Sequence, residues 1–312
     1  MQPITSSSRI IDAAIELSKR RRKTVAVAAA SDSAVLAAVS DAEKLGVCDA
    51  LLFGNDSRIK EIAESDGIDI SNLTIEHHDD PVEAAYNAVK AADKGRADVV
   101  MKGFVGTSQL LKMVLSKDFN LRGKNTMSHT AVLDIPGYHK LIGITDGGMV
   151  VKPDFETKIQ MIENGVEVFR ALGFDKPKVA LSGAIDYVHE NFPSTLLNKR
   201  IIEHFEAGQL KECEIAGPMT LEAATNRDIA GQRGIESPVG GDADLFVVDS
   251  IEECNIVSKV LILFIKAVFA GVIIGAKVPI SLVSRTDSAQ NKKASLSIAC
   301  LVAEYLSQKG GE

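Results

Sequence analysis

Apolar residues recur along the chain in two patterns, short runs and longer segments with helical spacing. Short, nearly continuous apolar runs are typical of strands buried on both faces of a sheet. In the first 120 residues such runs occupy residues 24–30, 48–53, 73–76 and 98–101. Segments with apolar residues three or four positions apart alternate with them, at residues 10–19, 31–39 and 57–63, from Pro81 onward, and around Leu110, Leu111 and Val114. This alternation predicts a parallel sheet with right-handed helical crossovers.

The pattern changes after residue 120. Residues 125–134 and 138–145 predict two adjacent strands joined by the turn Ile135-Pro136-Gly137, which suits a hairpin or a crossing between domains. The later elements are a helix from Pro153 and Asp154, strands at 178–181, 214–216 and 244–249, helices at 195–206 and 251–270, a strand at 280–283, and a final helix carrying Leu296, Ile298 and Leu301. We predict that residues 1–135 and 274–312 form a first α/β domain and that residues 136–273 form a second one inserted into it.

The composition is that of a globular protein with an aliphatic core. Of the 312 residues, 46% are hydrophobic and 25% charged, but only 5% are aromatic and none is Trp. The net charge of −7 argues against nucleic acid as a partner. The cysteines form no Cys-x-x-Cys pair and no zinc spacing, so we expect them to be reduced, buried and dispensable for activity. They are Cys48, Cys213, Cys254 and Cys300.

Neither a signal peptide nor a membrane span is predicted. The basic run from Arg20 to Lys23 follows an amphipathic segment instead of preceding an apolar one. The longest apolar run, residues 260–276, is interrupted by Lys266 and two glycines, and it is too short to cross a bilayer. We therefore expect a cytoplasmic protein without a membrane partner.

The richest candidate chemistry follows the strand at 280–283. The chain continues there as Ser284-Arg285-Thr286-Asp287-Ser288 and then enters the final helix. A strand, a polar turn and a helix start place side chains at the carboxyl edge of a sheet, where helix N–H groups favour anions. The guanidinium of Arg285 adds donors that suit phosphate. The alternative is that Asp287 or Ser288 only caps the helix and Arg285 is a surface charge.

A second candidate anion site is the segment Lys102-Gly103-Phe104-Val105-Gly106-Thr107. It follows a strand and precedes a helix, with Lys102 as the charge and Thr107 or Ser108 as the helix cap. Helix capping alone is the simpler alternative. The segment is not a Walker loop, and the chain has neither a Gly-x-Gly-x-x-Gly fingerprint after its first strand nor a Gly-x-Ser-x-Gly elbow.

Several stretches in combination resemble the phosphate acetyltransferase and phosphate butyryltransferase family, and the butyryl branch most closely. They are Leu121-Arg122, Ser128-His129-Thr130-Ala131-Val132, Ile144-Thr145-Asp146 with Pro153-Asp154, Gly217-Pro218, the run from Ser237 to Asp244, and Gly275-Ala276-Lys277-Val278-Pro279-Ile280 leading into Ser284-Arg285-Thr286-Asp287-Ser288. The resemblance implies an α/β protein of the two-domain isocitrate/isopropylmalate dehydrogenase type, with parallel sheets and a cleft between domains. It also implies the reaction of acyl-CoA with phosphate to give acyl phosphate and coenzyme A.

The resemblance further implies that Ser284 and Arg285 match the family's active-site Ser-Arg pair. One departure matters, because the family's acetyltransferases carry an Asp one turn into the following helix as the proposed base for the thiol. Asn291 stands at the corresponding position and cannot accept a proton at neutral pH. Asp287 is the nearest acid, and it is therefore our candidate for the base.

The chemistry assigns roles to the remaining candidates. Phosphate requires cationic forks, for which Arg285 and Arg122 are our choices. Ser284 or a helix N–H would bind the oxyanion, and Asp287 or His129 would transfer the thiol proton. Ser128, His129 and Lys102 complete the predicted substrate-binding set. No metal ion or redox cofactor is expected, and the predicted partners are acyl-CoA, phosphate and further copies of the chain in a homo-oligomer.

Two other functions stay open at this point. The first is a nicotinamide-dependent hydroxyacid dehydrogenase of the same fold, although the chain has no Asp-x-x-x-Asp pair for a divalent ion. The second is a non-catalytic sensor of acyl-CoA or phosphate, which would retain Arg285 but need no base. The substitution of Asp by Asn291 agrees with the sensor.

The phosphate role of Arg285 gives the first testable prediction. Arg285→Lys should lower the rate by about 30- to 1000-fold, or about 2–4 kcal/mol of transition-state stabilisation, because an ammonium lacks the planar fork of a guanidinium. Steady-state kinetics with phosphate varied at saturating acyl-CoA measure this loss, and binding of coenzyme A should change far less. A folded Arg285→Ala variant with wild-type phosphate kinetics would show that Arg285 is only a surface charge.

Overall fold

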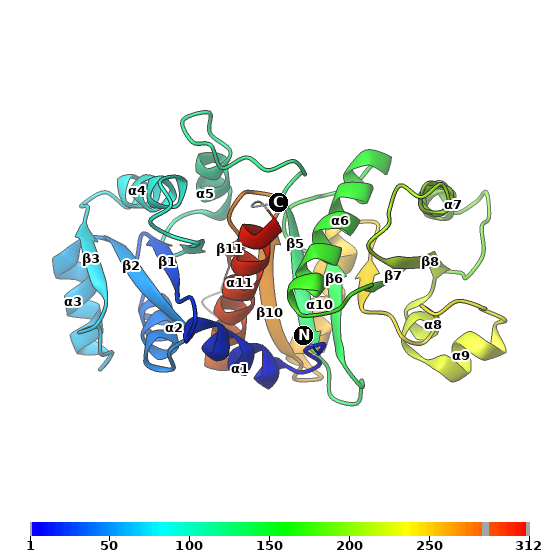
Figure 1. Cartoon of the computed structure of the whole chain (residues 1–312), viewed down its shortest axis with the longest axis horizontal. Helices are drawn as coiled ribbons and strands as arrows, with labels where there is room; N and C mark the ends of the chain where they lie inside the picture. The colour runs from blue at the N-terminus through cyan, green and yellow to red at the C-terminus, as the bar shows by residue number, and fades with distance from the viewer. Residues whose placement is uncertain (1, 283–286, 310–312) are drawn as a thin grey trace. The chain divides into compact units, whose positions relative to one another are not determined.

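The computed structural model describes residues 2–282 and 287–309 (Figure 1). Contacts between Cα atoms divide the chain into two compact units. Unit 1 consists of Met1–Ser7 and Asn125–Phe269, and unit 2 consists of Ser8–Lys124 and Ala270–Glu312. Both units combine helices with strands, so the fold is α/β, as predicted.

The strands of unit 2 are mainly parallel. Their order in the sheet is β3 (Thr74–His77), β2 (Cys48–Gly54), β1 (Lys23–Ala28), β4 (Val99–Lys102), β11 (Ile280–Ser281) and β10 (Val268–Ile274). All neighbours pair in parallel except β10 and β11, which are antiparallel. The residues of β1 and β4 are almost entirely buried, which explains why their runs are continuous and not alternating.

Six helices accompany these strands, as the spacing of apolar residues predicts. They are α1 (Ser7–Ser18), α2 (Ser33–Lys44), α3 (Asp56–Ser65), α4 (Pro81–Asp93), α5 (Thr107–Val114) and α11 (Ala289–Lys309). The predicted start of α4 is confirmed, because Pro81 opens it and the Asp80 carboxylate accepts a hydrogen bond from the Val82 N–H. The helix α4 packs against β1 and β2, and α11 packs against α2 and β11.

A buried ion pair connects α11 to the start of β1. Lys23 is only 1% exposed, and its Nζ lies 2.7 Å from Glu304 Oε2 and 3.4 Å from Asp98 Oδ1. Burial acts to raise the pKa of Glu304, but Lys23, Gln308 and Arg21 together outweigh it and the pKa is lowered. A buried charge without its partner is costly, so Lys23 and Glu304 fix the register of α11 against the sheet.

Unit 1 has its own mixed set of strands and helices. The strand order is β5 (Ser128–Asp134), β6 (Leu141–Thr145), β9 (Leu245–Val247), β7 (Lys178–Ser182) and β8 (Glu214–Met219). The helices are α6 (Phe155–Ala171), α7 (Pro193–Glu206), α8 (Leu221–Thr225), α9 (Arg227–Gln232) and α10 (Ile251–Leu263). The predicted hairpin is confirmed, because β5 and β6 pair antiparallel, whereas the other neighbours pair in parallel.

The bounds of the two units differ from the predicted domain division at 135/136 and 273/274. The hairpin explains the first difference, because β5 pairs with β6 along its length and is therefore grouped with it in unit 1. A boundary within the turn at residues 135–137 would separate two paired strands. The domain assignment itself stays a prediction.

The predicted helix over residues 251–270 is wrong at its end. The helix α10 stops at Leu263, and Val268–Ile274 instead forms β10, whose Ile273 pairs with Ile280 of β11. Lys266 has a φ of 61°, which no continuing helix allows. A short apolar run fits a buried strand and a buried helix equally well, so only pairing with β11 distinguishes them. The predicted parallel sheets are in fact mixed, because β5–β6 and β10–β11 pair antiparallel.

A network of basic side chains surrounds Asp242 at the amino ends of the unit 1 strands. Its carboxylate lies 2.8 Å from His139 Nε2, 3.0 Å from Lys140 Nζ and 3.1 Å from Arg227 Nη2, and it also pairs with Lys178. Burial opposes ionisation of Asp242, but the bonds from Lys178, Lys140 and His139 prevail and hold its pKa below the usual range. Asp242 therefore joins the segments that precede β6, β7 and β9.

We predict that Asp242→Asn lowers the free energy of unfolding by about 2–4 kcal/mol at pH 7, because it leaves several cations without their anion. Since the folded-state pKa of Asp242 lies below its unfolded value of 3.8, this stabilisation is present above about pH 4 and is lost as the pH falls further. Urea unfolding at pH 7 and pH 3 should thus show that the free energies of unfolding of the wild type and the Asp242 variant differ less at pH 3 than at pH 7. Asp12→Asn, at an exposed position, is the control. An equal loss of unfolding free energy in this control would contradict the stabilising role of Asp242.

Candidate functional site

The topological switch point of unit 2 lies between β1 and β4. From β1 the chain proceeds to β2 and β3 on one side, and after β3 it returns to β4 on the other side of β1. In open parallel sheets, ligands bind outside the carboxyl ends of the strands at such a point. The strand β11 pairs in parallel with β4, Ser281 opposite Met101, so the chain that leads to residues 283–287 leaves from the same edge.

Gly103 allows a close backbone approach at this edge. Its N–H donates to the Ala28 carbonyl oxygen at 2.9 Å, and the next residue, Phe104, donates to the Ala29 carbonyl oxygen at 2.6 Å. A Cβ atom at position 103 would lie 2.2 Å from the Ala29 oxygen, so only glycine fits. Lys102 is half-buried beside it, and its Nζ donates to the Gly103 carbonyl oxygen at 3.1 Å. The structure thus places Lys102 at the switch point.

The helix after Lys102 begins differently from the prediction. Its N-cap residue is Gly106, and no side chain caps it, so the expected cap by Thr107 or Ser108 is wrong. Both residues lie within the first turn of α5, where their hydroxyls do not replace an N-cap oxygen. The uncapped N–H groups of α5 therefore face the same loop that carries Lys102.

Arg122 lies on the surface of unit 2 beside the segment that precedes β11. It forms an isolated antiparallel bridge with Ala276, and Lys277 donates its N–H to the Leu121 carbonyl oxygen at 2.8 Å. The Arg122 Nε donates to the Leu115 carbonyl oxygen at 2.7 Å, which leaves its two terminal nitrogens exposed. Further exposed cations of this region form no ion pair with any described residue, and they are Lys112, Lys117, Lys124 and Lys277.

Only part of the predicted Ser-Arg segment can be located. Ser284 and Arg285 lie outside the described residues. Asp287 is half-buried, and Ser288 accepts a hydrogen bond from the Asn291 N–H at 3.1 Å, which is an N-cap bond at the start of α11. Of the two capping candidates, Ser288 therefore makes this bond, and Asn291 itself is buried in the first turn.

Ser128 and His129 open β5 in unit 1, and both are buried. Ser128 Oγ accepts a hydrogen bond from Asn164 Nδ2 at 2.8 Å. The ring of His129 stacks on Phe269, with centroids 6.0 Å apart. Its backbone N–H donates to Asp146 Oδ2 at 2.8 Å. These two residues are therefore parts of the folded interior of unit 1, together with a carboxylate to which the sequence assigned no role.

Asp146 organises the end of β6. Its second oxygen, Oδ1, accepts hydrogen bonds from the N–H groups of Gly148 at 2.6 Å and Met149 at 2.7 Å. The side chain is buried, so one carboxylate satisfies three backbone donors that water does not reach. Asp-Gly-Gly directly after an apolar strand was the sequence signal for this loop, but the signal does not show which donors the carboxylate would bind.

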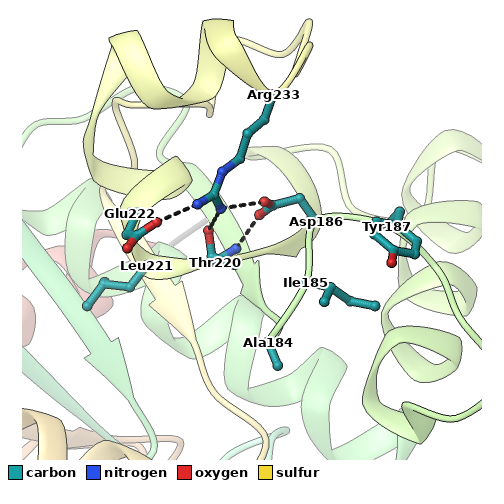
Figure 2. A pocket seen from close by; sticks show the side chains of 8 residues that line it. All are labelled: Ala184, Ile185, Asp186, Tyr187, Thr220, Leu221, Glu222 and Arg233. Carbon is teal, nitrogen blue, oxygen red and sulfur yellow. Dashed lines mark hydrogen bonds and ion pairs between the residues drawn. The ribbon is translucent and has the colours of Figure 1, made fainter.

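A cavity of unit 1 lies at the carboxyl ends of β7 and β8, with a volume of about 680 Å³ (Figure 2). Arg233 lines this cavity and donates hydrogen bonds to Asp186 Oδ2 and Thr220 Oγ1, each at 2.6 Å. It also forms an ion pair with Glu222. Burial acts to raise the pKa of Asp186, but the Thr220 N–H and Arg233 lower it. Two carboxylates face one guanidinium, so the cavity does not suit a phosphate.

The cysteines have no setting for nucleophilic chemistry. All four are buried and free. Burial raises the pKa of both Cys213 and Cys254 to about 12, and the hydrogen bond with Cys48, together with burial, raises the pKa of Cys300 well above the usual value. A thiol with such a pKa is protonated at neutral pH and is a poor nucleophile. Within the described residues, no group of three or more His, Cys, Asp or Glu side chains is arranged to bind a metal ion, and no helix is long and apolar enough to cross a membrane.

We predict that Asp146→Asn lowers the free energy of unfolding by about 1.5–3 kcal/mol, because an amide nitrogen would face the His129 N–H donor and the charge on the acceptor would be lost. Chemical denaturation measures the loss. Asp154→Asn is the matched control, because this exposed residue caps α6 through one oxygen and asparagine caps helices equally well. Wild-type stability of the Asp146 variant would show that the carboxylate is not needed for the loop.

Comparison with known proteins agrees with the predicted resemblance. A family described as phosphate acetyl/butaryl transferase matches residues 71–300. The chain is 36% identical to the phosphate butyryltransferase of Clostridium acetobutylicum, across 93% of this chain and 96% of that protein. It is 37% identical to the phosphate acetyltransferase of Thermotoga maritima, across 93% of this chain and 98% of that protein.

Solved structures show the same similarity. A branched-chain phosphotransacylase from Enterococcus faecalis V583 has a TM-score of 0.80 and 31% identity, and the match covers 90% of this chain and 99% of that one. A 4-hydroxythreonine-4-phosphate dehydrogenase from Klebsiella pneumoniae has a TM-score of 0.56 at 12% identity, which is a similarity of fold alone. It covers 90% of this chain and 99% of that chain.

Proposed function

The chain belongs to the phosphate acetyl/butyryl transferase family and is a phosphate acyltransferase, and we propose that it exchanges coenzyme A for phosphate on a short acyl group of the butyryl type. The match to the family model and to its members confirms the predicted resemblance, reaction and enzyme class. The acyl chain length, the residues that act and the order of steps belong to the proposal.

The observation that carries the proposal is the concentration of cations on unit 2. Lys102 lies at the switch point of a parallel sheet, next to the uncapped start of α5. Arg122 and Lys277 are exposed on adjacent segments and form no ion pair with a described residue. Coenzyme A and inorganic phosphate are both strongly anionic, so a concentration of exposed cations suits their binding.

In the proposed mechanism, acyl-CoA and phosphate bind together. A phosphate oxygen attacks the thioester carbonyl carbon, a tetrahedral oxyanion forms, and the carbon–sulfur bond then breaks to release coenzyme A and acyl phosphate. Arg285 and Arg122 orient the phosphate, and Ser284 or a helix N–H stabilises the oxyanion. Direct attack without a covalent enzyme intermediate agrees with the buried, protonated cysteines.

The released thiolate needs a proton in one direction, and the thiol must lose it in the other. Asp287 is our proposed group, with His129 as the second candidate. Asp287 is half-buried and directly precedes Ser288, whose hydroxyl makes the N-cap bond. His129 is 8% exposed and stacks on Phe269, which makes it the less accessible of the two.

Other parts of the proposal are not tested by the structure. The isocitrate dehydrogenase-like arrangement of two domains around a cleft stays a prediction, as do the cytoplasmic location and the absence of a cofactor. The dehydrogenase alternative has only a similarity of fold in its favour, and the sensor alternative would require that the chain has lost the activity of its relatives.

Release of free thiol from acyl-CoA esters in the presence of phosphate tests the function. We expect turnover that depends on phosphate, with kcat/KM for butyryl-CoA at least tenfold above that for acetyl-CoA. Arg122→Ala should raise the KM for phosphate at least tenfold, because it removes a charged contact worth about 1.5–3 kcal/mol. Arg9→Ala, at an exposed arginine of α1, is the matched control.

The possible results separate the alternatives. Absence of turnover with every ester, together with tight binding of acyl-CoA, would support the sensor and contradict the enzyme. Preference for acetyl-CoA would retain the enzyme class and overturn only the chain length. An unchanged phosphate KM in the Arg122 variant would remove this residue from the proposed site.

A further inference from the structure

Phe104 exposes an apolar ring at the carboxyl edge of the unit 2 sheet. It lies in the loop between β4 and α5 and is 49% exposed, more than any other large apolar residue in the described part of unit 2. Single exposed apolar side chains are common on protein surfaces, so the significance of this ring depends on where it lies.

The backbone that carries the ring is fixed by β1. The Phe104 N–H donates to the Ala29 carbonyl oxygen at 2.6 Å, and the Gly103 N–H donates to the Ala28 carbonyl oxygen at 2.9 Å. Ala29 has a φ of 60°, a left-handed conformation that a residue with a Cβ rarely adopts. Strain of this kind is retained where the surrounding structure requires it, commonly at functional sites. The ring is therefore exposed, but its point of attachment is held in place.

Two helices begin beside this loop, and they differ in what they offer to an anion. The start of α2 already holds a carboxylate, because Asp32 accepts a hydrogen bond from the Val35 N–H. The start of α5 has Gly106 as its N-cap residue and no side-chain cap. Lys102 lies at the end of β4, just before the same loop. Uncapped N–H groups and an ammonium favour a phosphate group at the start of α5.

The reaction itself places the acyl group beside the phosphate. Before the new bond forms, the attacking phosphate oxygen and the carbonyl carbon lie about 3–3.5 Å apart. The Cα atom of Phe104 is within about 7 Å of the Cα atoms of Lys102 and Gly106, because two residues of extended chain span no more than this. An acyl chain that begins next to a phosphate at the start of α5 is therefore within reach of the ring.

On the basis of the proposed function, we propose that the ring of Phe104 contacts the acyl chain of the substrate and sets the chain-length specificity. Each methylene beyond acetyl covers part of the exposed ring and leaves water. A fully buried methylene contributes about fourfold to an equilibrium or rate constant, and a chain covered on one side by the ring gains about threefold. The contact involves only the part of the substrate that differs between esters, not the nucleotide and pantetheine that all acyl-CoA esters share.

The test is a comparison of kcat/KM for acetyl-, propionyl- and butyryl-CoA at saturating phosphate. In Phe104→Ala we expect a loss of less than twofold for acetyl-CoA, about threefold for propionyl-CoA and about tenfold for butyryl-CoA. Phe104→Leu retains an apolar contact and should stay within threefold of the wild type for butyryl-CoA. The KM for phosphate should change less than twofold in both variants, because neither alters a charge.

Leu45→Ala is the matched control. Leu45 is 43% exposed, and it follows α2 near the start of β2, at the opposite edge of the same sheet. Its replacement should leave kcat/KM for all three esters unchanged. The melting temperatures of all variants should lie within about 2 °C of the wild type, because each change affects a largely exposed side chain.

The results separate this role from the function on which it depends. Unchanged kcat/KM values in Phe104→Ala would overturn the contact with the acyl chain. An equal loss for all three esters would also overturn it, because the ring would then contact the shared part of coenzyme A. Wild-type protein without turnover of any ester would contradict the function and this role with it. A wild type that prefers acetyl-CoA would overturn only the butyryl preference, and the increase of the loss with each methylene would still support the role of Phe104.

Discussion

Strands that are buried on both faces leave their polar chemistry to the strand ends, and this constraint governs unit 2. The side chains of β1 and β4 are buried except those of Thr24 and Lys102, which are half-buried, and among the buried ones only Lys23 carries a charge. The polar groups at the carboxyl ends of these strands are the Ala28 and Ala29 carbonyls and the ammonium of Lys102, the last residue of β4. Gly103 brings these groups close together, because the absence of a Cβ lets one loop lie directly on the end of the neighbouring strand.

The same constraint explains how charge is distributed. Where a charge is buried, the structure provides its partner: Lys23 has Glu304, and the completely buried Lys158 has Asp249 and the amide oxygen of Asn198. Burial lowers the pKa of Lys158, and Asp249 opposes this shift. Such pairs hold segments in place and are not available to a substrate. Exposed cations such as Arg122 have no acidic partner among the described residues, and they are available to an anion.

The region from α10 to β10 shows how one apolar run serves two purposes. Residues 251–263 form a helix that packs on unit 1 through one side, and residues 268–274 form a strand beside β11. Between them, Phe264 and Ile265 remain exposed. The high apolar content of this run thus reflects two different elements, a helix and a buried strand.

From its residues alone, the sequence determined most element positions, because continuous apolar runs, helical spacing and starts such as Pro81 and Asp154 are local features. It also determined the family, through short motifs in a fixed order. Only the tertiary structure decided that β10 is a strand, that Asp146 binds the backbone N–H of His129, and that Arg122 lies beside Ala276. Each of these depends on contact between segments far apart in the chain, and local spacing carries no information about which distant segment will be the neighbour.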